Sequence, residues 1–595
     1  MVKKILFSII LILVGTTFIV NPTTKEVAAG IAILLFGMIM LEEGFNSFIE
    51  GPLQKWLKKI TNTFYKSFGL GFLTTALLQS SSLISVITIS FISAGLIDLT
   101  AGIGIIFGSN LGTTATAWLV SIFGLSLKVS SLAMPLIAFG ILFVLQKSKS
   151  MKGAGYVMAG LGFFFLGIHF MKQGFEVYQN TISLADYAIP GFWGLLVYTF
   201  VGILITLVLQ SSSAAMALIL TTLAVGQITY ENSLALAIGA NVGTTITAII
   251  GSLTSNIAGK RLAGAHFIFN MVTGILALIF ITKLGQLVNY ISSSTGIASD
   301  NYPIKLSIFH TVFNLIGVLV MAPFIGPLVK VLKRLFVEKR DDKGMEYPFY
   351  LNPSILSFPQ TALRALLDES HRLFEKVTFE IVAHGLNLHL KDIKGQESLK
   401  KVVKKSKEEL EIDIDEMYYK KVKIIYSKII KYATLAQGKF SLSPKDMESF
   451  THIKLANRNM VETIKNIQGL RKNVSKYMVS DNTYIQTEYD RLRHKVSQVL
   501  REIHFTQKAN DPQAHSKNLS ALKEKAIKSD LLLDGTLDKL IREKKISSSM
   551  ATSLLNDSDI VANLIKRLIE TTELLYTHRD TLIGSPAQGT TFGLE

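Results

Sequence analysis

Cysteine is absent from the 595 residues, so disulfides, thiolate metal sites and cysteine nucleophiles are all excluded. The sequence also contains no P-loop, no zinc-binding spacing and no Ser/His/Asp set, and the chain is therefore not expected to be an enzyme. No nucleic-acid-binding motif accompanies the net charge of +17, so nucleic acid is not an expected partner.

Charged side chains are scarce in the first part of the chain. Residues 1–340 hold 21 Lys and Arg and 10 Asp and Glu, whereas residues 341–595 hold 40 and 34. Because about 20 apolar residues span the hydrocarbon core of a bilayer, we expect the first part to be a multi-pass domain of the cell (inner) membrane, in contact with lipid. The second part is expected to be soluble.

Positive charges beside the apolar segments set the expected orientation. Lys3 and Lys4 precede an apolar run over residues 5–20, which we interpret as an uncleaved first helix with a cytoplasmic amino terminus. Lys and Arg cluster over residues 330–340, directly after the last apolar segment, and place the carboxyl-terminal part in the cytoplasm. Further apolar segments are expected near residues 27–48, 68–97, 100–126, 129–146, 153–178, 192–226, 232–257, 262–290 and 304–333.

A four-residue motif, Gln-Ser-Ser-Ser, occurs twice in the apolar part. The copies at residues 79–82 and 210–213 each lie in a long run without charge, and each is followed by a G-x-N-x-G-T-T segment, at residues 108–114 and 239–245. A single offset of 131 residues relates the two pairs of segments. We therefore predict two structural repeats, over about residues 27–146 and 157–290, with further helices to residue 335.

The chemistry of these segments favours a bound anion together with a cation. Hydroxyl and amide N–H groups donate to an anion, and the positive end of a helix dipole strengthens such a site. Neither segment contains a charged residue, and an isolated buried anion is very unfavourable. A small hard cation bound by neutral oxygens would compensate it, so the residues predict anion–cation symport.

The paired motifs resemble those of the type II sodium–phosphate cotransporter family over roughly residues 27–320. The resemblance implies an all-α membrane domain of two inverted repeats, whose re-entrant hairpins carry the Gln-Ser-Ser-Ser motifs and hold phosphate and sodium between them. It also implies that phosphate contacts Ser80, Ser81, Ser82, Ser211, Ser212, Ser213 and Thr113. By the same resemblance, sodium is held by Gln210, Ser211, Thr244 and Thr247, with Asn241 shaping the site and with Gln79, Asn110 and Thr116 as repeat mates.

Beyond a linker over residues 341–358, we expect a cytoplasmic helical bundle over residues 359–583 and a disordered tail over residues 584–595. Ser443 and Pro444 are typical of a helix start, and Asp511 with Pro512 opens another helix in the same way. This part resembles the PhoU-like domains appended to bacterial members of the same family.

PhoU-like domains can bind metal through acidic pairs spaced four residues apart on a helix. Here Glu409–Asp413 and Glu411–Asp415 have that spacing, within an expected helix over residues 404–421. We favour a solvated helix face over a metal site, because charges of both signs alternate along this segment.

Two H-x-x-[IV]-F-N segments need a separate interpretation. They place His266 four residues before Asn270 and His310 four residues before Asn314. A His within a membrane segment is a candidate functional residue, but hydrogen bonding between packed helices explains the spacing equally well, and we favour that interpretation.

Together, these features predict sodium-coupled symport of inorganic phosphate by alternating access, with Na⁺ as the coupling ion, no cofactor and a regulatory cytoplasmic domain. Two alternatives stay open. One keeps the fold but is a phosphate exporter or a carrier of another oxyanion; the other is a membrane-anchored phosphate-signalling protein. A homo-oligomer is also left open.

Overall fold

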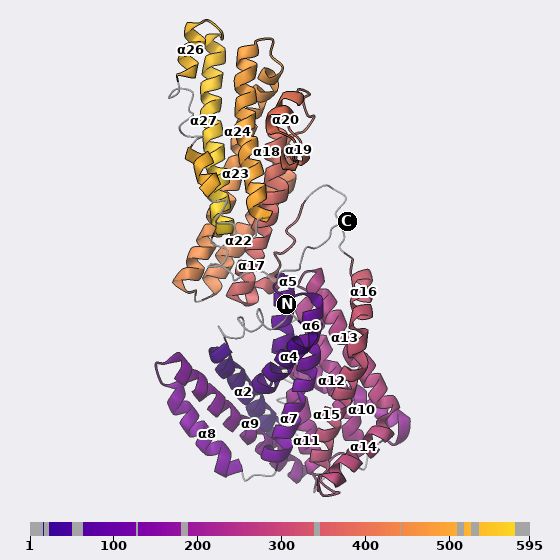
Figure 1. The fold of residues 1–595 in the computed structure, drawn as a ribbon. Coiled ribbons are helices and arrows are strands. Elements are labelled where there is room, and N and C mark those ends of the chain that lie inside the picture. The colour runs from indigo at the N-terminus through magenta and orange to yellow at the C-terminus, as the bar shows by residue number, and fades with distance from the viewer. Residues whose placement is uncertain are drawn as a thin grey trace. The chain divides into compact units, whose positions relative to one another are not determined.

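The computed structural model describes residue 16 and residues 23–49, 63–125, 129–179, 189–337, 346–440, 442–508, 517–524 and 535–577. Within these ranges the regular structure is helical and contains no strand, in agreement with the all-α prediction. The chain divides into two compact units, unit 1 (Met1–Glu338) and unit 2 (Lys339–Glu595) (Figure 1). Unit 1 contains the apolar segments and unit 2 contains most of the charged residues.

Unit 1 contains seven described helical segments that are long and apolar enough to cross a membrane, judged by length and composition. They are Thr24–Phe45, Leu99–Gly124, Lys149–Val177, Gly191–Leu209, Tyr230–Ser252, Ile257–Ile279 and Tyr302–Leu335. The individual helices are α2 (Thr23–Ile49), α4 (Phe64–Leu78), α5 (Ser81–Ser93), α6 (Leu99–Gly112), α7 (Thr114–Leu119), α8 (Val129–Val144), α9 (Lys149–Gln179), α10 (Gly191–Leu209), α11 (Ser212–Ala224), α12 (Tyr230–Ser252), α13 (Ile257–Ile279), α14 (Ile281–Ser294), α15 (Tyr302–Met321) and α16 (Ile325–Leu335).

Each Gln-Ser-Ser-Ser motif interrupts one of the expected apolar segments, the first within residues 68–97 and the second within residues 192–226. Helix α4 ends at Leu78 and α5 begins at Ser81, and α10 ends at Leu209 before α11 begins at Ser212. At about 1.5 Å of rise per residue, the 13 residues of α5 or α11 extend roughly 20 Å, which is less than the hydrocarbon core of a bilayer.

Glycine contacts show that each interrupted segment is a hairpin. A Cβ on Gly104 would lie 2.9 Å from Ser67 Cβ, and a Cβ on Gly112 would lie 2.8 Å from Thr75 Cβ, so α4 and α6 run in parallel. Helix α5 must therefore return the chain, and the tip of the hairpin lies at Gln79. Contacts of Gly239 and Gly243 place α10 parallel to α12 in the same way, with the second tip at Gln210.

Helices α2 and α9 pack in antiparallel orientation along a line of glycines. The built Cβ of Gly30 contacts Gly167 O at 2.9 Å, that of Gly37 contacts Gly160 O at 2.7 Å, and that of Gly44 contacts Gly153 O at 2.8 Å. A side chain at any of these positions would separate the helices, since each distance is shorter than van der Waals contact.

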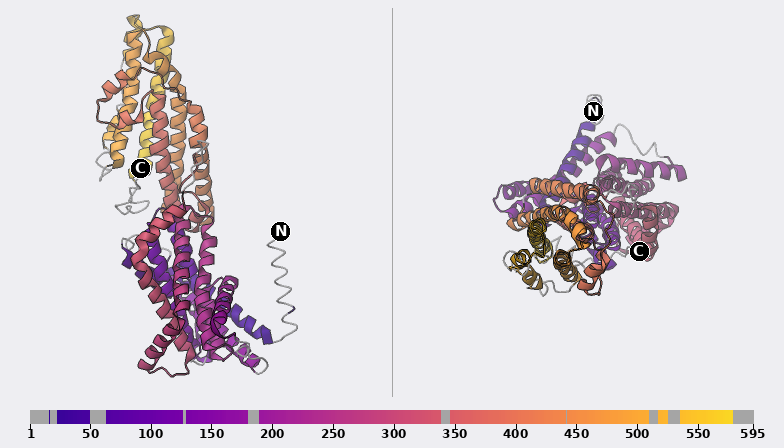
Figure 2. Two further views of the ribbon diagram at one scale, coloured as in Figure 1. Left: turned by 90° about the vertical axis from the view of Figure 1, so that its right-hand side faces the viewer. Right: turned by 90° about the horizontal axis from the view of Figure 1, so that it is seen from above.

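Unit 2 is a bundle in which α23, α24 and α27 lie alongside one another (Figures 1 and 2). Ser443 begins α23 as predicted, because its hydroxyl accepts from Asp446 N and Pro444 occupies the first turn. The helices are α17 (Pro359–Arg372), α18 (Phe379–Gly385), α19 (Leu390–Lys394), α20 (Leu399–Lys405), α21 (Ile414–Met417), α22 (Ile424–Lys439), α23 (Pro444–Met478), α24 (Thr483–Lys508), α26 (Thr536–Arg542) and α27 (Ser548–Thr572).

The expected continuous helix over residues 404–421 is wrong. Helix α20 ends at Lys405, residues 406–413 are not helical, and Asp413 caps α21 by accepting from Glu416 N at 3.0 Å. Glu409 and Asp413 therefore do not share the face of one helix, and the geometric basis for a metal site there is lost.

Several expectations concern residues outside the described ranges. They are the first apolar run over residues 5–20, the helix start at Asp511 and Pro512, and the tail over residues 584–595.

Candidate functional site between the hairpin tips

The two hairpin tips have the same local backbone. Gln79 and Gln210 adopt the left-handed conformation, with φ of 55° and 54°, and the next residue is extended in both copies. Ser80 then caps α5 by accepting from Leu83 N at 3.3 Å, and Ser211 caps α11 by accepting from Ala214 N at 3.1 Å. The remaining N–H groups of each first turn have no partner within their helix, which is the usual basis of anion binding at a helix start.

Polar contacts join the first tip to the second hairpin. Thr116 Oγ1 donates to Gln79 Oε1 at 2.6 Å and lies 3.0 Å from Ser213 Oγ, and Ser213 Oγ also reaches the backbone oxygen of Gln79 at 3.1 Å. All three residues are buried. Four oxygens thus meet without a charged group, an arrangement that suits a small hard cation.

A second contact mirrors the first. Ser82 Oγ lies 3.4 Å from Thr247 Oγ1, and these residues are the repeat mates of Ser213 and Thr116. Each repeat therefore contributes a Ser from its hairpin to a Thr of the other repeat. The same exchange occurs between α2 and α9, where Gly30 meets Gly167 and the equivalent pair is Gly160 with Gly37.

Several predicted residues direct side-chain donors to their own helix, among them Thr247, whose hydroxyl donates to Thr244 O at 2.7 Å. Thr113 donates to Asn110 O at 2.6 Å, and Thr244 donates to Asn241 O at 2.6 Å. Asn110 donates to Ile106 O at 2.9 Å. The remaining predicted serines, Ser81 and Ser212, are buried in the first turns of α5 and α11.

Asn241 differs from its repeat mate because it joins three helices. Its amide nitrogen donates to Asn270 Oδ1 on α13 at 2.9 Å and to Asn314 Oδ1 on α15 at 3.0 Å. Asn314 in turn donates to the backbone oxygen of His310 at 2.9 Å. The asparagines of the H-x-x-[IV]-F-N segments therefore act in helix packing, as we favoured, while both ring nitrogens of buried His266 have no hydrogen-bond partner among the described residues.

The two repeats also differ in conformation. Gln79 is buried and contacts Thr116, whereas Gln210 is exposed and Ser211 Oγ contacts Met38 Sδ at 4.0 Å. Helix α6 ends at Gly112, before α7, while α12 continues without a break through the equivalent residues. The structure thus assembles the Gln–Thr pair of the first repeat and leaves Gln210 apart from Thr247.

Sequence reasoning did not identify Thr75 and Ser109, which support the first hairpin. Thr75 Oγ1 donates to Ser109 Oγ at 2.7 Å, and the mate of Thr75, Thr206, donates to Ala240 O at 3.2 Å. Thr75 and Thr206 are related by the same offset of 131 residues, and this repeat in the sequence could have identified them.

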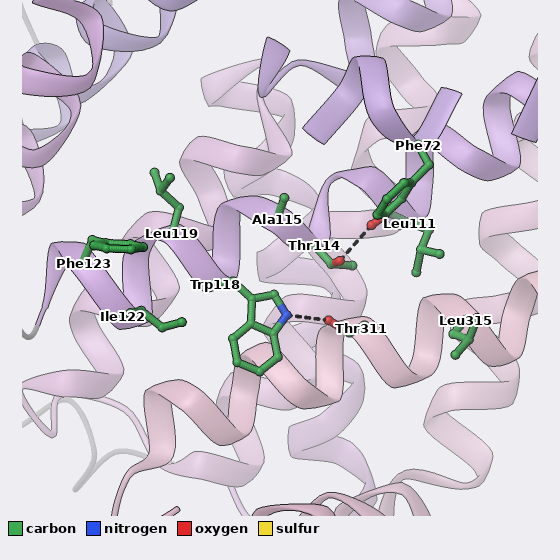
Figure 3. A pocket seen from close by; sticks show the side chains of 10 residues that line it. All are labelled: Phe72, Leu111, Thr114, Ala115, Trp118, Leu119, Ile122, Phe123, Thr311 and Leu315. Atoms are coloured by element: carbon green, nitrogen blue, oxygen red, sulfur yellow. Dashed lines mark hydrogen bonds between the residues drawn. The ribbon is translucent and has the colours of Figure 1, made fainter. Parts of the chain in front are cut away.

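None of the predicted residues is among those that line an apolar groove of about 490 Å³ beside α7 and α15 (Figure 3). Its polar groups bond to one another or to the backbone: Trp118 Nε1 donates to Thr311 Oγ1 at 3.0 Å and Thr114 Oγ1 donates to Leu111 O at 2.8 Å (Figure 3). Such a lining does not recognise an anion. No group of three or more His, Asp or Glu suited to a metal ion occurs among the residues that the structure describes.

The fold and the site define a multi-pass helical membrane protein with an uncharged polar cluster between two hairpins. The model of the Na⁺/Pi-cotransporter family matches residues 33–173 and 195–298, both within unit 1. This match confirms, for the membrane part of the chain, the family resemblance that the sequence motifs predicted.

Similar proteins occur in bacteria and mammals. The chain is 27% identical over 369 residues to "Putative inorganic phosphate export protein YjbB" of Escherichia coli strain K12. The aligned region covers 61% of this chain and 65% of that protein. It is 27% identical over 314 residues to "Uncharacterized protein YqeW" of Bacillus subtilis, covering 52% of this chain and 97% of that protein. Over 102 residues it is 34% identical to human "Sodium-dependent phosphate transport protein 2C", covering 16% of this chain and 17% of that protein. No solved structure matches the chain.

Proposed function

We propose that the protein carries inorganic phosphate across the cell membrane in symport with sodium. The observation that supports this most directly is the uncharged cluster of Gln79, Thr116 and Ser213, in which the start of α11 approaches the tip of the first hairpin. Amide and hydroxyl donors there suit an anion, and the absence of a charged residue calls for a cation that travels with it.

Residue roles follow from this arrangement. Phosphate is proposed to bind the N–H groups and hydroxyls at the starts of α5 and α11, that is Ser80 to Ser82 and Ser211 to Ser213, with Thr113 nearby. Sodium is proposed to bind oxygens of the Gln–Thr pairs, Gln79 with Thr116 and Gln210 with Thr247, and Thr244, Asn241 and Asn110 support these pairs from α12 and α6.

We further propose that the two halves are inverted repeats. The antiparallel packing of α2 on α9, and the exchanged pairs Ser213–Thr116 and Ser82–Thr247, are what an approximate two-fold axis between the halves would produce. In this arrangement the hairpins are re-entrant, each entering and leaving the bilayer on one side.

Alternating access accounts for the difference between the halves. Gln79 is buried against Thr116 while Gln210 is exposed, and α6 is broken where α12 is continuous. Exchanging these two conformations between equivalent repeats would close the open half and open the closed one, with the phosphate site fixed between them.

The test is uptake of labelled phosphate into proteoliposomes with and without an inward sodium gradient. Symport requires that the gradient drives accumulation and that a proton or potassium gradient does not. Equal uptake with a sodium, a proton and a potassium gradient would contradict sodium coupling.

A phosphate exporter is the second candidate, because the printed name of the Escherichia coli relative describes export. The direction is tested by loading the vesicles with sodium and labelled phosphate and measuring efflux. Competition by sulfate and arsenate in the same vesicles tests whether phosphate is the preferred oxyanion.

Unit 2, a helical bundle, is proposed to be the cytoplasmic PhoU-like domain that regulates transport.

A further inference from the structure

The longest run without an acidic residue in unit 2 is rich in lysine. Between Glu416 and Asp446 the sequence holds seven lysines and no acidic residue. Residues 341–595 hold 40 basic and 34 acidic residues in total, so the remainder of this part has 33 and 34. Without these seven lysines the carboxyl-terminal part would have a net charge of −1.

The lysines lie on an exposed face of α22 and of the π-helical turn before it, Tyr418–Lys423. Val422, Ile425, Ile429, Ala433 and Ala436 form the buried face. The exposed face, called the lysine face below, consists of Lys420, Lys423, Ser427, Lys428, Lys431, Thr434, Leu435 and Lys439.

Few of these charges are neutralised within the protein. Lys420 pairs with Glu416, and Lys439 Nζ donates to Leu356 O at 2.6 Å. Lys428 and Lys431 make no ion pair with any residue in the described ranges of unit 2. Tyr419, 58% exposed, lies beside the lysine face with Lys423 Nζ 4.7 Å from its ring centroid, and Leu435 is also exposed.

The lysine face begins where the chain enters unit 2. Glu346 N donates to Lys420 O at 3.1 Å, and α16 of unit 1 ends at Leu335. Only ten residues, 336–345, separate these points, and an extended chain of that length reaches about 36 Å at most. Ten residues thus tether the start of the lysine face to the end of a segment with membrane-spanning composition, Tyr302–Leu335.

We infer that the lysine face docks on anionic lipid headgroups of the membrane that holds unit 1. Clustered lysines gain about 1 kcal/mol each at an anionic surface, which is about fivefold in the binding constant. Exposed Tyr419 and Leu435 suit the headgroup region, where amphipathic side chains are favoured. The short connection raises the effective concentration of the surface, so a moderate intrinsic affinity suffices.

The experiment uses the full chain in lipid nanodiscs. Because the protein has no cysteine, Ser427→Cys provides a single site on the lysine face for a fluorophore, and Thr552→Cys on α27 provides an exposed reference site. Quenching by headgroup-labelled lipid is compared in discs of phosphatidylcholine alone and of phosphatidylcholine with phosphatidylglycerol. We expect strong quenching at position 427 only with the anionic lipid, and its loss at high salt, where the Debye length falls to about 3 Å.

Charge removal provides the decisive comparison. Lys428→Gln with Lys431→Gln should weaken docking about 25-fold, two fivefold steps. Lys465→Gln with Lys472→Gln removes two exposed lysines from α23 and should leave the quenching unchanged. Equal quenching in neutral discs, or no response to the α22 substitutions, would overturn the proposal, since the short linker alone would then explain proximity. Binding of added nucleic acid by position 427 without any lipid quenching would overturn it in favour of another partner.

Discussion

Thr116 connects the two hairpins through a single hydroxyl, which donates to Gln79 and lies beside Ser213. Thr116→Val keeps the shape of the side chain but leaves the buried Gln79 oxygen without its donor. An unsatisfied buried group costs about 1–3 kcal/mol, so we expect sodium-driven phosphate uptake to fall roughly 5- to 150-fold. The measurement is initial uptake in proteoliposomes at equal protein content.

Thr88→Val is the matched control for this substitution. Thr88 is also buried and its hydroxyl donates to Ile84 O at 2.6 Å on its own helix, away from the hairpin contacts. It should transport within about twofold of the unaltered protein, because helix backbone oxygens already have a partner. Similar losses in both variants would assign the effect to folding and contradict the site.

Asn314 holds Asn241 in place from another helix. Asn314→Ala should raise the sodium concentration for half-maximal uptake severalfold, because Asn241 loses one of its two acceptors and the adjoining Thr244 is less well fixed. Asn314→Asp, in its protonated form, retains the acceptor and the donor to His310 O and should restore most of the sodium affinity. Equal effects of both substitutions, or a change confined to phosphate affinity, would contradict this role.

At the scale of single residues, the repeat in the sequence identified which side chains matter but not which of them meet. Ser213 and Thr116 are 97 positions apart, and Ser82 and Thr247 are 165 apart. Such pairs depend on how the hairpins cross, and no local pattern encodes that. The exposed position of Gln210 was equally unpredictable, because its sequence context matches that of buried Gln79.

At the scale of helices, backbone contact between each hairpin and the following helix depends on glycine. A Cβ on Gly239 would lie 1.9 Å from Thr199 O, whereas a Cβ on Gly285, inside α14, meets nothing within 4 Å. Gly239→Ala should destabilise unit 1 by about 1–3 kcal/mol through overpacking, even though alanine favours the helix by about 1 kcal/mol. Gly285→Ala should be neutral or stabilising. Thermal unfolding in one detergent compares the two, and equal midpoints would contradict the close packing of α10 on α12.

The helical elements were largely predictable because apolar runs, breaks and caps are local signals. Ser443 and Pro444 begin α23 as expected, and both Gln-Ser-Ser-Ser motifs end a helix. The non-helical conformation of residues 406–413 was not predictable, because partners from distant elements replace the hydrogen bonds that a helix would make there. Arg471 donates to Leu410 O at 2.6 Å, and Leu410 N donates to Asn387 Oδ1 at 3.2 Å.

At the scale of the whole molecule, unit 1 contains every residue that we propose to bind phosphate or sodium. The 314 residues matched in YqeW make up 97% of that protein, so this relative has little sequence beyond the matched part. A chain ending after Arg340 should therefore insert and transport phosphate with sodium dependence, although its maximal rate is free to change. If the helical unit were instead the functional end of a membrane-anchored signalling protein, neither the full chain nor the shortened chain would transport phosphate. Uptake in proteoliposomes of the full chain and the shortened chain separates these outcomes, and Thr116→Val in the shortened chain should abolish most of the remaining uptake if the site lies in unit 1.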